Sequence, residues 1–296
     1  MKISKAIIAC AGYGTRFLPI TKTIQKEMLP ILNRPLIDYI VDDCANAGIE
    51  EIIFVVKEGH DMVRDYYTRF DQLQQYLEKM HKLERFERFT QPRKNLTFKF
   101  VTQKLSEQYG TAVPVRLAHD YVKNEDAFLV FMGDDFVFNS DGTSETQAMI
   151  ELFRKSNSSA LATCINKEPE SLHKYGIAAL RTDTNNGCQY LLRLVEKPQP
   201  GTAPSTLANI SKYIFTQKVF SVIENQQPDP ESNELYITDT ITTLAQQDQV
   251  VVHTPTGEYL DGGDPIGWLR ANLIVGLHHP DYKKPLAELL KHVNKN

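Results

Sequence analysis

The chain has 296 residues, and its 33 Lys and Arg against 37 Asp and Glu give a formal net charge of −4. With 42% hydrophobic and 24% charged residues, the composition is that of an ordinary globular protein and excludes a disordered chain. Without a basic excess, a nucleic-acid partner is not expected. No apolar run approaches the roughly 18 residues of a membrane helix, so we expect no membrane partner and a cytoplasmic location.

The first half of the chain alternates short apolar runs with helical patterns. The predicted strands are Lys5–Ala11, Glu51–Val56, Leu96–Thr102 and Ala127–Met132. The predicted helices lie at about 36–45, 60–89 and 111–121. Strands separated by helices are typical of parallel βαβ units. We therefore expect an α/β fold with a mixed, mostly parallel sheet that helices cover.

The second half is less regular but has no internal repeat and no clear linker. The predicted strands are Ala160–Ile165, Ile177–Leu180, Tyr190–Val195 and Ala208–Phe215. The predicted helices are Gln217–Asn225, Thr238–Gln247, Pro265–His278 and Pro285–Val293. We expect one domain over 1–296, with a first half at about 1–135, an elaborated second half at 136–280 and a C-terminal helix at 281–296.

The four cysteines, Cys10, Cys44, Cys164 and Cys188, are scattered along the chain and form no CxxC pair. Their spacing favours neither a zinc site nor a disulfide framework. We expect reduced thiols in the core.

A glycine-rich and basic loop, AGYGTRFLPITKTIQKEMLP (11–30), follows the first strand. Gly12 and Gly14 allow the backbone to turn tightly, and exposed N–H groups there can hold phosphate oxygens. Such a glycine pair alone is often only a turn, and neither the dinucleotide fingerprint nor the P-loop pattern fits here. Arg16 and Lys26 add two cations, so the loop as a whole favours a polyphosphate site.

Two acidic turns follow apolar runs. Asp134 and Asp135 follow Gly133 at the end of the AFLVFM run, where a sheet places its ligands. Asp261 lies in a second turn, YLDGGD, that ends at Asp264. Mg²⁺ usually takes one or two protein carboxylates, so Asp134 and Asp261 are candidate metal ligands. Each aspartate could instead be a turn or helix-cap residue, and for Asp264, which precedes Pro265, the N-cap is favoured.

A third polar pair, Glu196 and Lys197, ends the run LLRLVEKP, and Gly176 lies in an earlier turn. A glutamate can accept hydrogen bonds from sugar hydroxyls, and a neighbouring lysine can bind a sugar phosphate. Alone, the pair is more simply a surface Glu-Lys at a strand end. The sequence contains no serine-nucleophile elbow and no recognisable catalytic triad.

Taken together, these motifs resemble the sugar nucleotidyltransferases, and KEMLP and the Asp134-Asp135 doublet point to the bacterial UTP–glucose-1-phosphate uridylyltransferase branch. The matching stretches are AGYGTRFLPITKTIQKEMLPILNRPLIDYIV, FLVFMGDDF, HKYGIAAL, LVEKP, ELYITDTI and DGGDPIGWLRANL. They extend from about Lys5 to Leu273, and the resemblance is weak across 60–100 and 136–170. The resemblance implies a Rossmann-like sheet, a first half that binds the nucleotide and a second half that binds the sugar.

The resemblance also implies roles for individual residues. The nucleotide would be bound by Ala11, Gly12, Gly14, Glu27, Gln103 and Gly110. The catalytic residues would be Arg16 and Lys26, which hold the nucleotide phosphates, together with the metal ligand Asp134 and with Lys197. The metal would be held by Asp134 and Asp261, and the sugar with its phosphate by Gly176, Glu196 and Lys197.

The implied reaction joins UTP and glucose 1-phosphate to give UDP-glucose and pyrophosphate, with Mg²⁺ as cofactor, in a homo-dimer or homo-tetramer. The chain departs from the family pattern at Gln25, where relatives usually have Pro, and at Gln108, where they usually have Gly. The departure at Gln108 and the weakly matching middle of the chain leave the specificity open. The alternatives are another nucleotide or sugar, such as dTTP or galactose 1-phosphate, a glycosyltransferase, and a non-catalytic regulator that binds nucleotide sugars. The adjacent aspartates argue against a glycosyltransferase, which normally has Asp-x-Asp.

Overall fold

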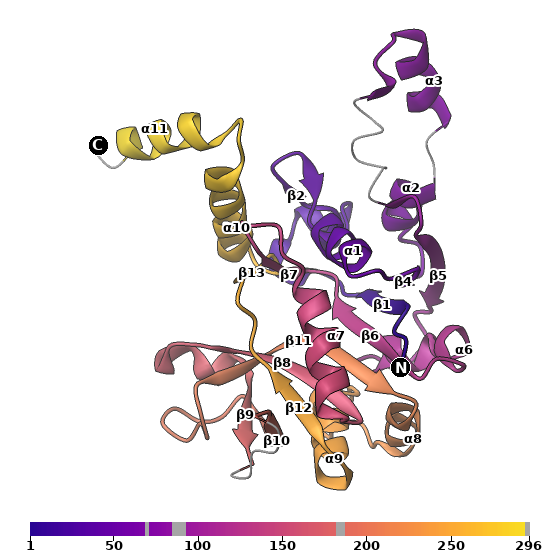
Figure 1. The fold of residues 1–296 in the computed structure, drawn as a ribbon, viewed down its shortest axis with the longest axis vertical. Helices are drawn as coiled ribbons and strands as arrows, with labels where there is room; N and C mark the ends of the chain where they lie inside the picture. The colour runs from indigo at the N-terminus through magenta and orange to yellow at the C-terminus, as the bar shows by residue number, and fades with distance from the viewer. Residues whose placement is uncertain (69–70, 85–92, 182–186, 294–296) are drawn as a thin grey trace.

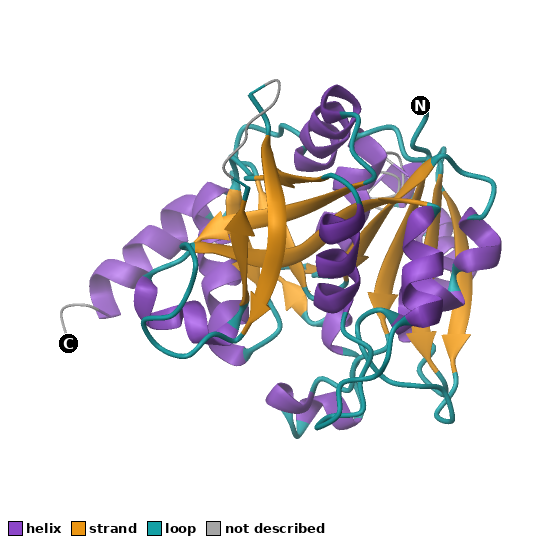
Figure 2. Ribbon diagram, turned by 90° about the horizontal axis from the view of Figure 1, so that it is seen from below, coloured by secondary structure: helices purple, strands orange, loops and turns teal. Residues whose placement is uncertain are grey.

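The computed structural model describes residues 1–68, 71–84, 93–181 and 187–293. Within them, a mixed sheet of nine strands forms the centre of the molecule, in the order β5-β4-β1-β6-β11-β8-β12-β10-β9 (Figure 2). Its strands are β1 (Lys5–Cys10), β4 (Glu51–Lys57), β5 (Thr97–Gln103), β6 (Ala127–Met132), β8 (Ala160–Asn166), β9 (Gly176–Leu180), β10 (Gln189–Glu196), β11 (Leu207–Thr216) and β12 (Val250–His253). All eight strands named in the sequence analysis are present, with ends shifted by at most one residue.

The expectation of a mostly parallel sheet is wrong. Strands β5, β4, β1 and β6 are parallel, as predicted, but β11 is antiparallel to β6 and to β8, and β10 is antiparallel to β9 and to β12. Because β11 also pairs with β9, strands β11, β8, β12, β10 and β9 close into a small barrel. The physical reason is connectivity: helical crossovers give parallel neighbours, whereas β9 and β10, which follow each other directly, pair as an antiparallel hairpin.

An irregularity in β11 helps the sheet to bend into this barrel. The register with β8 shifts between Asn209 and Tyr213, and Ser211 has a φ of 55°. A bulge of this kind turns a strand and increases its twist. Strand β11 can therefore continue the open sheet through β6 and also close the barrel through β9.

Helices cover both faces of the sheet, and each face has its own hydrophobic core (Figure 2). Along β1, Ala6 and Ile8 belong to one core and Ile7 to the other, the alternation that a strand imposes on successive side chains. The first core is covered by α1 (Ile37–Asn46), α7 (Glu145–Ser156) and α10 (Pro265–His278), and the second by α5 (Val113–Leu117), α8 (Lys218–Asn225) and α9 (Ile237–Gln247).

Two segments extend away from this body (Figure 1). One carries α3 (Asp71–Lys79), beyond α2 (Met62–Thr68), and the other is α11 (Lys283–Val293), which packs against α10. The predicted helical region at 60–89 contains α2 and α3, and its residues 69–70 and 85–89 lie outside the described residues. The remaining helix is α6 (His119–Val122), which with α5 accounts for the pattern at 111–121.

The sequence analysis missed helix α7 and five short strands. These are β12 of the large sheet, β2 (Pro30–Ile31), β3 (Arg34–Pro35), β7 (Asp135–Phe138) and β13 (Glu258–Asp261). Strands β7 and β13 form a separate antiparallel pair in which Asp135 lies opposite Asp261. This small ribbon brings the two acidic turns of the sequence side by side.

All four cysteines are free and buried, which confirms the expected thiols in the core. None of the helices in the described ranges combines the length and the apolar character needed to cross a bilayer.

Candidate active site

The glycine loop folds back over itself at the end of β1. Gly14 has a left-handed backbone with a φ of 62°, and its carbonyl accepts a hydrogen bond of 2.8 Å from the Thr21 hydroxyl. A Cβ on Gly12 would lie 3.2 Å from the ammonium of Lys26. Glycine at both positions therefore lets the Lys26 side chain approach the loop backbone closely.

The two aspartates proposed as metal ligands come together beside this loop. The Gly262 N–H donates to the carbonyl of Asp134 (2.9 Å), and the Gly263 N–H donates to Oδ1 of Asp261 (2.8 Å). A Cβ on Gly263 would lie 2.8 Å from Oδ2 of Asp134, 2.9 Å from Nη2 of Arg16 and 3.0 Å from Oδ1 of Asp261. Three charged groups from distant parts of the chain therefore surround one glycine.

Lys26 pairs with one of these carboxylates. Its Nζ lies 2.5 Å from Oδ2 of Asp134 and 3.9 Å from Oε1 of Glu27. Burial works to raise the pKa of Asp134, but Lys26 and Arg16 outweigh it and hold that pKa below its usual value. Asp134 is therefore ionised at neutral pH.

Asp261 is in a different electrostatic state. Burial and the neighbouring Asp134 charge raise the pKa of Asp261, although the hydrogen bond from Gly263 and the charge of Arg16 oppose them. Two adjacent carboxylates that repel each other are stabilised by a cation placed between them. The pair fits Mg²⁺, which needs only one or two protein carboxylates and takes oxygen ligands from phosphate and water. Among the described residues no group of three or more His, Cys, Asp or Glu could hold a metal, so a purely protein-ligated site is not formed there.

A cavity of about 140 Å³ lies beside the glycine loop, next to Lys26 and Asp134. Six residues predicted from the sequence line it: Ala11, Gly12, Lys26, Gln103, Gly110 and Asp134. Tyr109, Thr111 and Glu234 also line it and were not predicted. The glycine loop, the end of β5 and the turn after β6 thus enclose one cavity.

The segment that carries Gly110 is hydrogen-bonded to the second half of the chain. The Leu235 N–H donates to the Tyr109 carbonyl, and the Ala112 N–H donates to the Leu235 carbonyl, both at 2.9 Å. Gly110 has a φ of 129°, and a Cβ there would meet the Leu235 backbone at 2.3 Å, so this position requires glycine.

The departures at Gln25 and Gln108 have structural roles. The Gln25 side chain is buried, and its Oε1 accepts a 3.2 Å hydrogen bond from the Val63 N–H at the start of α2. Gln108 donates from its side chain to the Asn233 carbonyl, and its own carbonyl accepts from Nε2 of Gln103 at 3.4 Å. Gln108 therefore helps to hold Gln103, one of the predicted nucleotide-binding residues.

Two of the predicted nucleotide residues, Gly14 and Glu27, do not line the cavity, and Glu27 is buried. It is 1% exposed, and a Cβ on Gly133 would press on its Cγ at 2.9 Å. No hydrogen-bond donor reaches either of its carboxylate oxygens. Burial raises the pKa of Glu27 to about 7 in spite of the nearby Lys26 charge.

The predicted sugar residues form a second cluster on the hairpin of β9 and β10. Gly176 lies opposite Glu196, and a Cβ on Gly176 would lie 3.0 Å from Oε2 of Glu196. Lys197 is exposed with a φ of 41°, and its N–H donates to the Tyr175 carbonyl at 3.1 Å. Burial and the charge of Asp261 raise the pKa of Tyr175, so this cluster adjoins the aspartate pair.

The second aspartate of the doublet, Asp135, is buried and has partners of its own. Nζ of Lys212 donates to the Asp135 carbonyl (3.1 Å) and to its carboxylate, and the Tyr259 hydroxyl donates to Oδ2 of Asp135 at 3.1 Å. This buried network joins β7 to β11 and β13. A lone lysine within the apolar run of β11 was the signal that could have revealed it. Asp264 is the N-cap of α10, as predicted, since its Oδ1 accepts from the N–H groups of two α10 residues, each at 3.0 Å.

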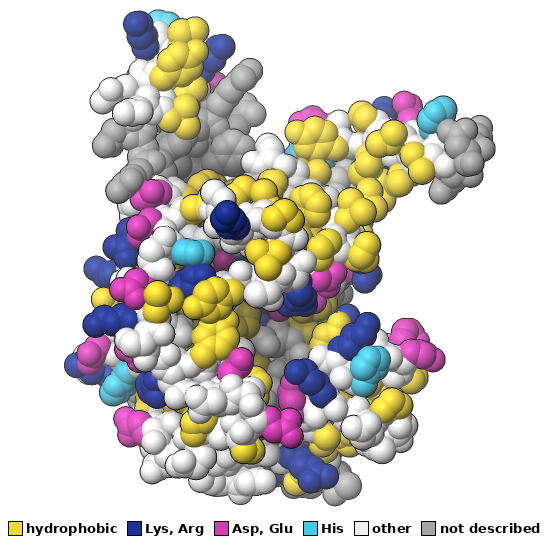
Figure 3. Space-filling model, turned by 180° about the vertical axis from the view of Figure 1, so that it is seen from behind, with side chains coloured by type: hydrophobic (Ala, Val, Ile, Leu, Met, Phe, Trp, Pro, Cys, Tyr) yellow, Lys and Arg dark blue, Asp and Glu magenta, His cyan; other side chains and the backbone are white. Residues whose placement is uncertain are grey.

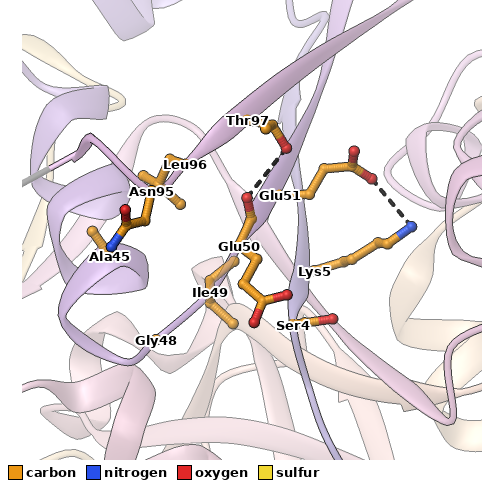
Figure 4. A pocket seen from close by; sticks show the side chains of 10 residues that line it. All are labelled: Ser4, Lys5, Ala45, Gly48, Ile49, Glu50, Glu51, Asn95, Leu96 and Thr97. Carbon is orange, nitrogen blue, oxygen red and sulfur yellow. Dashed lines mark hydrogen bonds and ion pairs between the residues drawn. The ribbon is translucent and has the colours of Figure 1, made fainter.

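A larger hollow of about 740 Å³ lies at the opposite edge of the sheet (Figure 4). Its lining includes Lys5, Glu51 and Thr97, the first residues of β1, β4 and β5. Its polar groups pair with each other, because Lys5 lies 3.1 Å from Glu51 and the Thr97 hydroxyl donates to the Glu50 carbonyl at 3.2 Å. Ligands of such sheets bind beyond the carboxyl ends of the strands, where the predicted residues gather.

The fold and this site define a class: α/β proteins that bind phosphate esters at the carboxyl edge of a sheet, with a cationic glycine loop and a pair of carboxylates. The sequence model of the nucleotidyl transferase family matches residues 5–275, and the chain belongs to that family.

Individual relatives extend over nearly the whole chain. A UTP–glucose-1-phosphate uridylyltransferase of Staphylococcus epidermidis is 34% identical over 295 residues, 99% of each chain. A UTP-bound UGPase from Acinetobacter baumannii is similar in structure, with a TM-score of 0.87, 30% identity, and coverage of 98% of this chain and 99% of that one. A UDP-glucose pyrophosphorylase in complex with UDP-glucose has a TM-score of 0.80 and 29% identity, and covers 93% of this chain and 98% of its own.

Proposed function

We propose that this protein transfers the uridylyl group of UTP to glucose 1-phosphate, giving UDP-glucose and pyrophosphate, with Mg²⁺ as cofactor. Full-length relatives with this activity in their names, and similar structures described as holding UTP or UDP-glucose, support the substrates. The observation that carries the proposal is the convergence of Asp134, Asp261 and Arg16 around Gly263, beside Lys26.

In the proposed reaction, an oxygen of the sugar phosphate attacks the α-phosphorus of UTP in line. The bond from the α-phosphorus to the bridging oxygen breaks, and its electron pair leaves with pyrophosphate. The sugar phosphate is already ionised at neutral pH, so no protein nucleophile and no general base are needed. When bound at Asp134 and Asp261, Mg²⁺ would act as a Lewis acid and a template for the phosphates.

The cationic side chains of the loop stabilise the negative charge of the phosphates. Arg16 and Lys26 bind the triphosphate and offset the charge that builds up on the leaving group. The N–H groups at Gly12 and Gly14 add donors that are already oriented. Gln103 and the backbone around Gly110 hold the base in the cavity next to Ala11, in agreement with the lining of that cavity.

The hairpin of β9 and β10 positions the second substrate. Glu196 accepts hydrogen bonds from glucose hydroxyls, Gly176 leaves room for the sugar ring, and Lys197 holds the sugar phosphate. Bringing two polyanions into line contributes much of the rate, because correct positioning replaces a bimolecular encounter.

The first test is pyrophosphate release by the purified protein. UTP, dTTP and ATP are each combined with glucose 1-phosphate or galactose 1-phosphate, with Mg²⁺ or with EDTA. We expect UTP and glucose 1-phosphate with Mg²⁺ to give the highest kcat/KM, and EDTA to abolish release. Nucleotide binding without release of pyrophosphate from any pair would contradict the proposed reaction and favour a non-catalytic regulator.

A further inference from the structure

Lys167 is a cation near the site that neither the sequence motifs nor the proposed reaction uses. It follows β8 directly and is half-buried, and its backbone N–H donates to the Thr206 carbonyl at 3.0 Å. Its Nζ lies 5.2 Å from the ring centre of Tyr175 and 5.1 Å from the ring centre of Tyr259. Both distances are within the range of cation–π attraction, so the two rings hold the ammonium between them.

The ammonium of Lys167 has no anion of its own. Among the residues that the structure describes, no hydrogen-bond acceptor and no carboxylate lies within bonding distance of its Nζ, which contacts the two rings. Burial lowers the pKa of Lys167, the distant charge of Asp261 opposes this, and Arg270 adds to it. Arg270 itself is paired with Glu258 at 2.8 Å. A partly desolvated cation with three unused donors favours an anionic ligand.

The two rings place Lys167 between the sugar cluster and the aspartate pair. Tyr175 directly precedes Gly176, and its carbonyl accepts the N–H of Lys197. Tyr259 lies on β13, two residues before Asp261, and its hydroxyl is fixed by Asp135. Through these two rings the ammonium adjoins both the sugar cluster and the aspartate pair, and the charge of Asp261 reaches it.

We propose that Lys167 binds the phosphate of the sugar 1-phosphate, which becomes the β-phosphate of the nucleotide sugar. This inference rests on the proposed function and adds a second lysine to the sugar-phosphate site. The ammonium orients the attacking phosphate and offsets its repulsion by the triphosphate. The Tyr175 and Tyr259 rings hold the ammonium without neutralising its charge.

The test compares Lys167→Met, which keeps the length of the side chain and removes its charge, with Lys167→Arg. The control is Lys174→Met, an exposed lysine on the same connection. Calorimetric titration without Mg²⁺ compares UDP-glucose, which has the β-phosphate, with UMP, which lacks it. We expect Lys167→Met to weaken UDP-glucose binding about tenfold and leave UMP binding unchanged, because one charge-assisted hydrogen bond is lost. We expect Lys167→Arg to restore most of the affinity and Lys174→Met to change neither ligand.

Kinetics give a second readout. We expect Lys167→Met to raise the KM for glucose 1-phosphate about tenfold with an unchanged KM for UTP. Unchanged UDP-glucose affinity in Lys167→Met, or an equal loss for UDP-glucose and UMP together with a lower Tm, would overturn the inference. Wild-type protein that binds UDP-glucose but releases no pyrophosphate would refute the proposed function alone. Wild-type protein that does not bind UDP-glucose would refute both.

Discussion

Glu27 combines complete burial with an unsatisfied carboxylate. Its pKa of about 7 in the folded protein lies above its ordinary value of 4.5, because burial disfavours the charge. Between these two pH values the folded state holds a proton that the unfolded state has lost. The contribution of Glu27 to the free energy of unfolding therefore falls as the pH rises from 4.5 to about 7, and is constant above that.

The substitution Glu27→Gln tests this residue with an amide of the same shape. From about pH 5 to about pH 8, we expect wild-type stability to fall relative to Glu27→Gln by about 2 kcal/mol. Urea denaturation in EDTA at the two pH values measures the difference, with all other carboxylates common to both proteins. Parallel changes in the two proteins would show that Glu27 is ionised in the folded state throughout, contrary to the argument.

At the scale of elements, the ribbon of β7 and β13 determines the geometry of the site. Each of these strands has four residues, yet together they bring Asp134 and Asp261 to the same glycine. Gly263 is the point of closest approach, since any side chain there would intrude among three charged groups. The turn between β13 and α10 therefore requires a glycine for catalysis, independently of the stability of either element.

We expect Gly263→Ala to lower kcat roughly a hundredfold, because displacing reacting groups by about 1 Å has effects of this size. The free energy of unfolding should change by less than about 1 kcal/mol, since the added methyl group meets only the tips of side chains. Pyrophosphate release and urea denaturation on the same sample separate the two effects. Full turnover, or a loss of turnover that only follows a loss of folded protein, would show that the approach of the three groups is not needed.

The sequence predicted the long elements but not these short ones. A strand such as β6 reads as an uninterrupted apolar run, whereas β7 and β13 are too short to show a period. Helix α7 did leave a signal that was missed: Ser144 caps it by accepting from the Gln147 N–H, the spacing of a capping box. Sequence motifs identified both acidic turns, but only strand pairing brings them together.

At the scale of the molecule, the sequence predicted the parallel half of the sheet but not the barrel. The order β5-β4-β1-β6 follows from alternating strands and helices, while the closure of β11 on β9 depends on a bulge near Ser211 that no composition rule reveals. Lys167 was missed for the same reason, since only the packing of β13 beside the barrel places Tyr259 and Tyr175 on either side of it. The division into a nucleotide half and a sugar half stays a prediction.

The C-terminal helices α10 and α11 have an apolar surface. Hydrophobic side chains gather along them on the face opposite to that of Figure 1, as Figure 3 shows, and Leu269, Leu289 and Val293 are among the exposed ones. The expectation of a homo-dimer or homo-tetramer stays a prediction from the family resemblance.

The central claim is that Asp134 and Asp261, from distant parts of the chain, hold one divalent cation beside the triphosphate. Its most direct test uses Mn²⁺ in place of Mg²⁺ and measures the affinity for Mn²⁺ in the presence of UTP by electron paramagnetic resonance. We compare wild type with Asp134→Asn, Asp261→Asn and Asp264→Asn, the last being a helix-cap control whose cap survives as asparagine. The account predicts that the first two variants each lose tenfold or more in Mn²⁺ affinity while the control binds like wild type, and wild-type affinity in Asp261→Asn would contradict it.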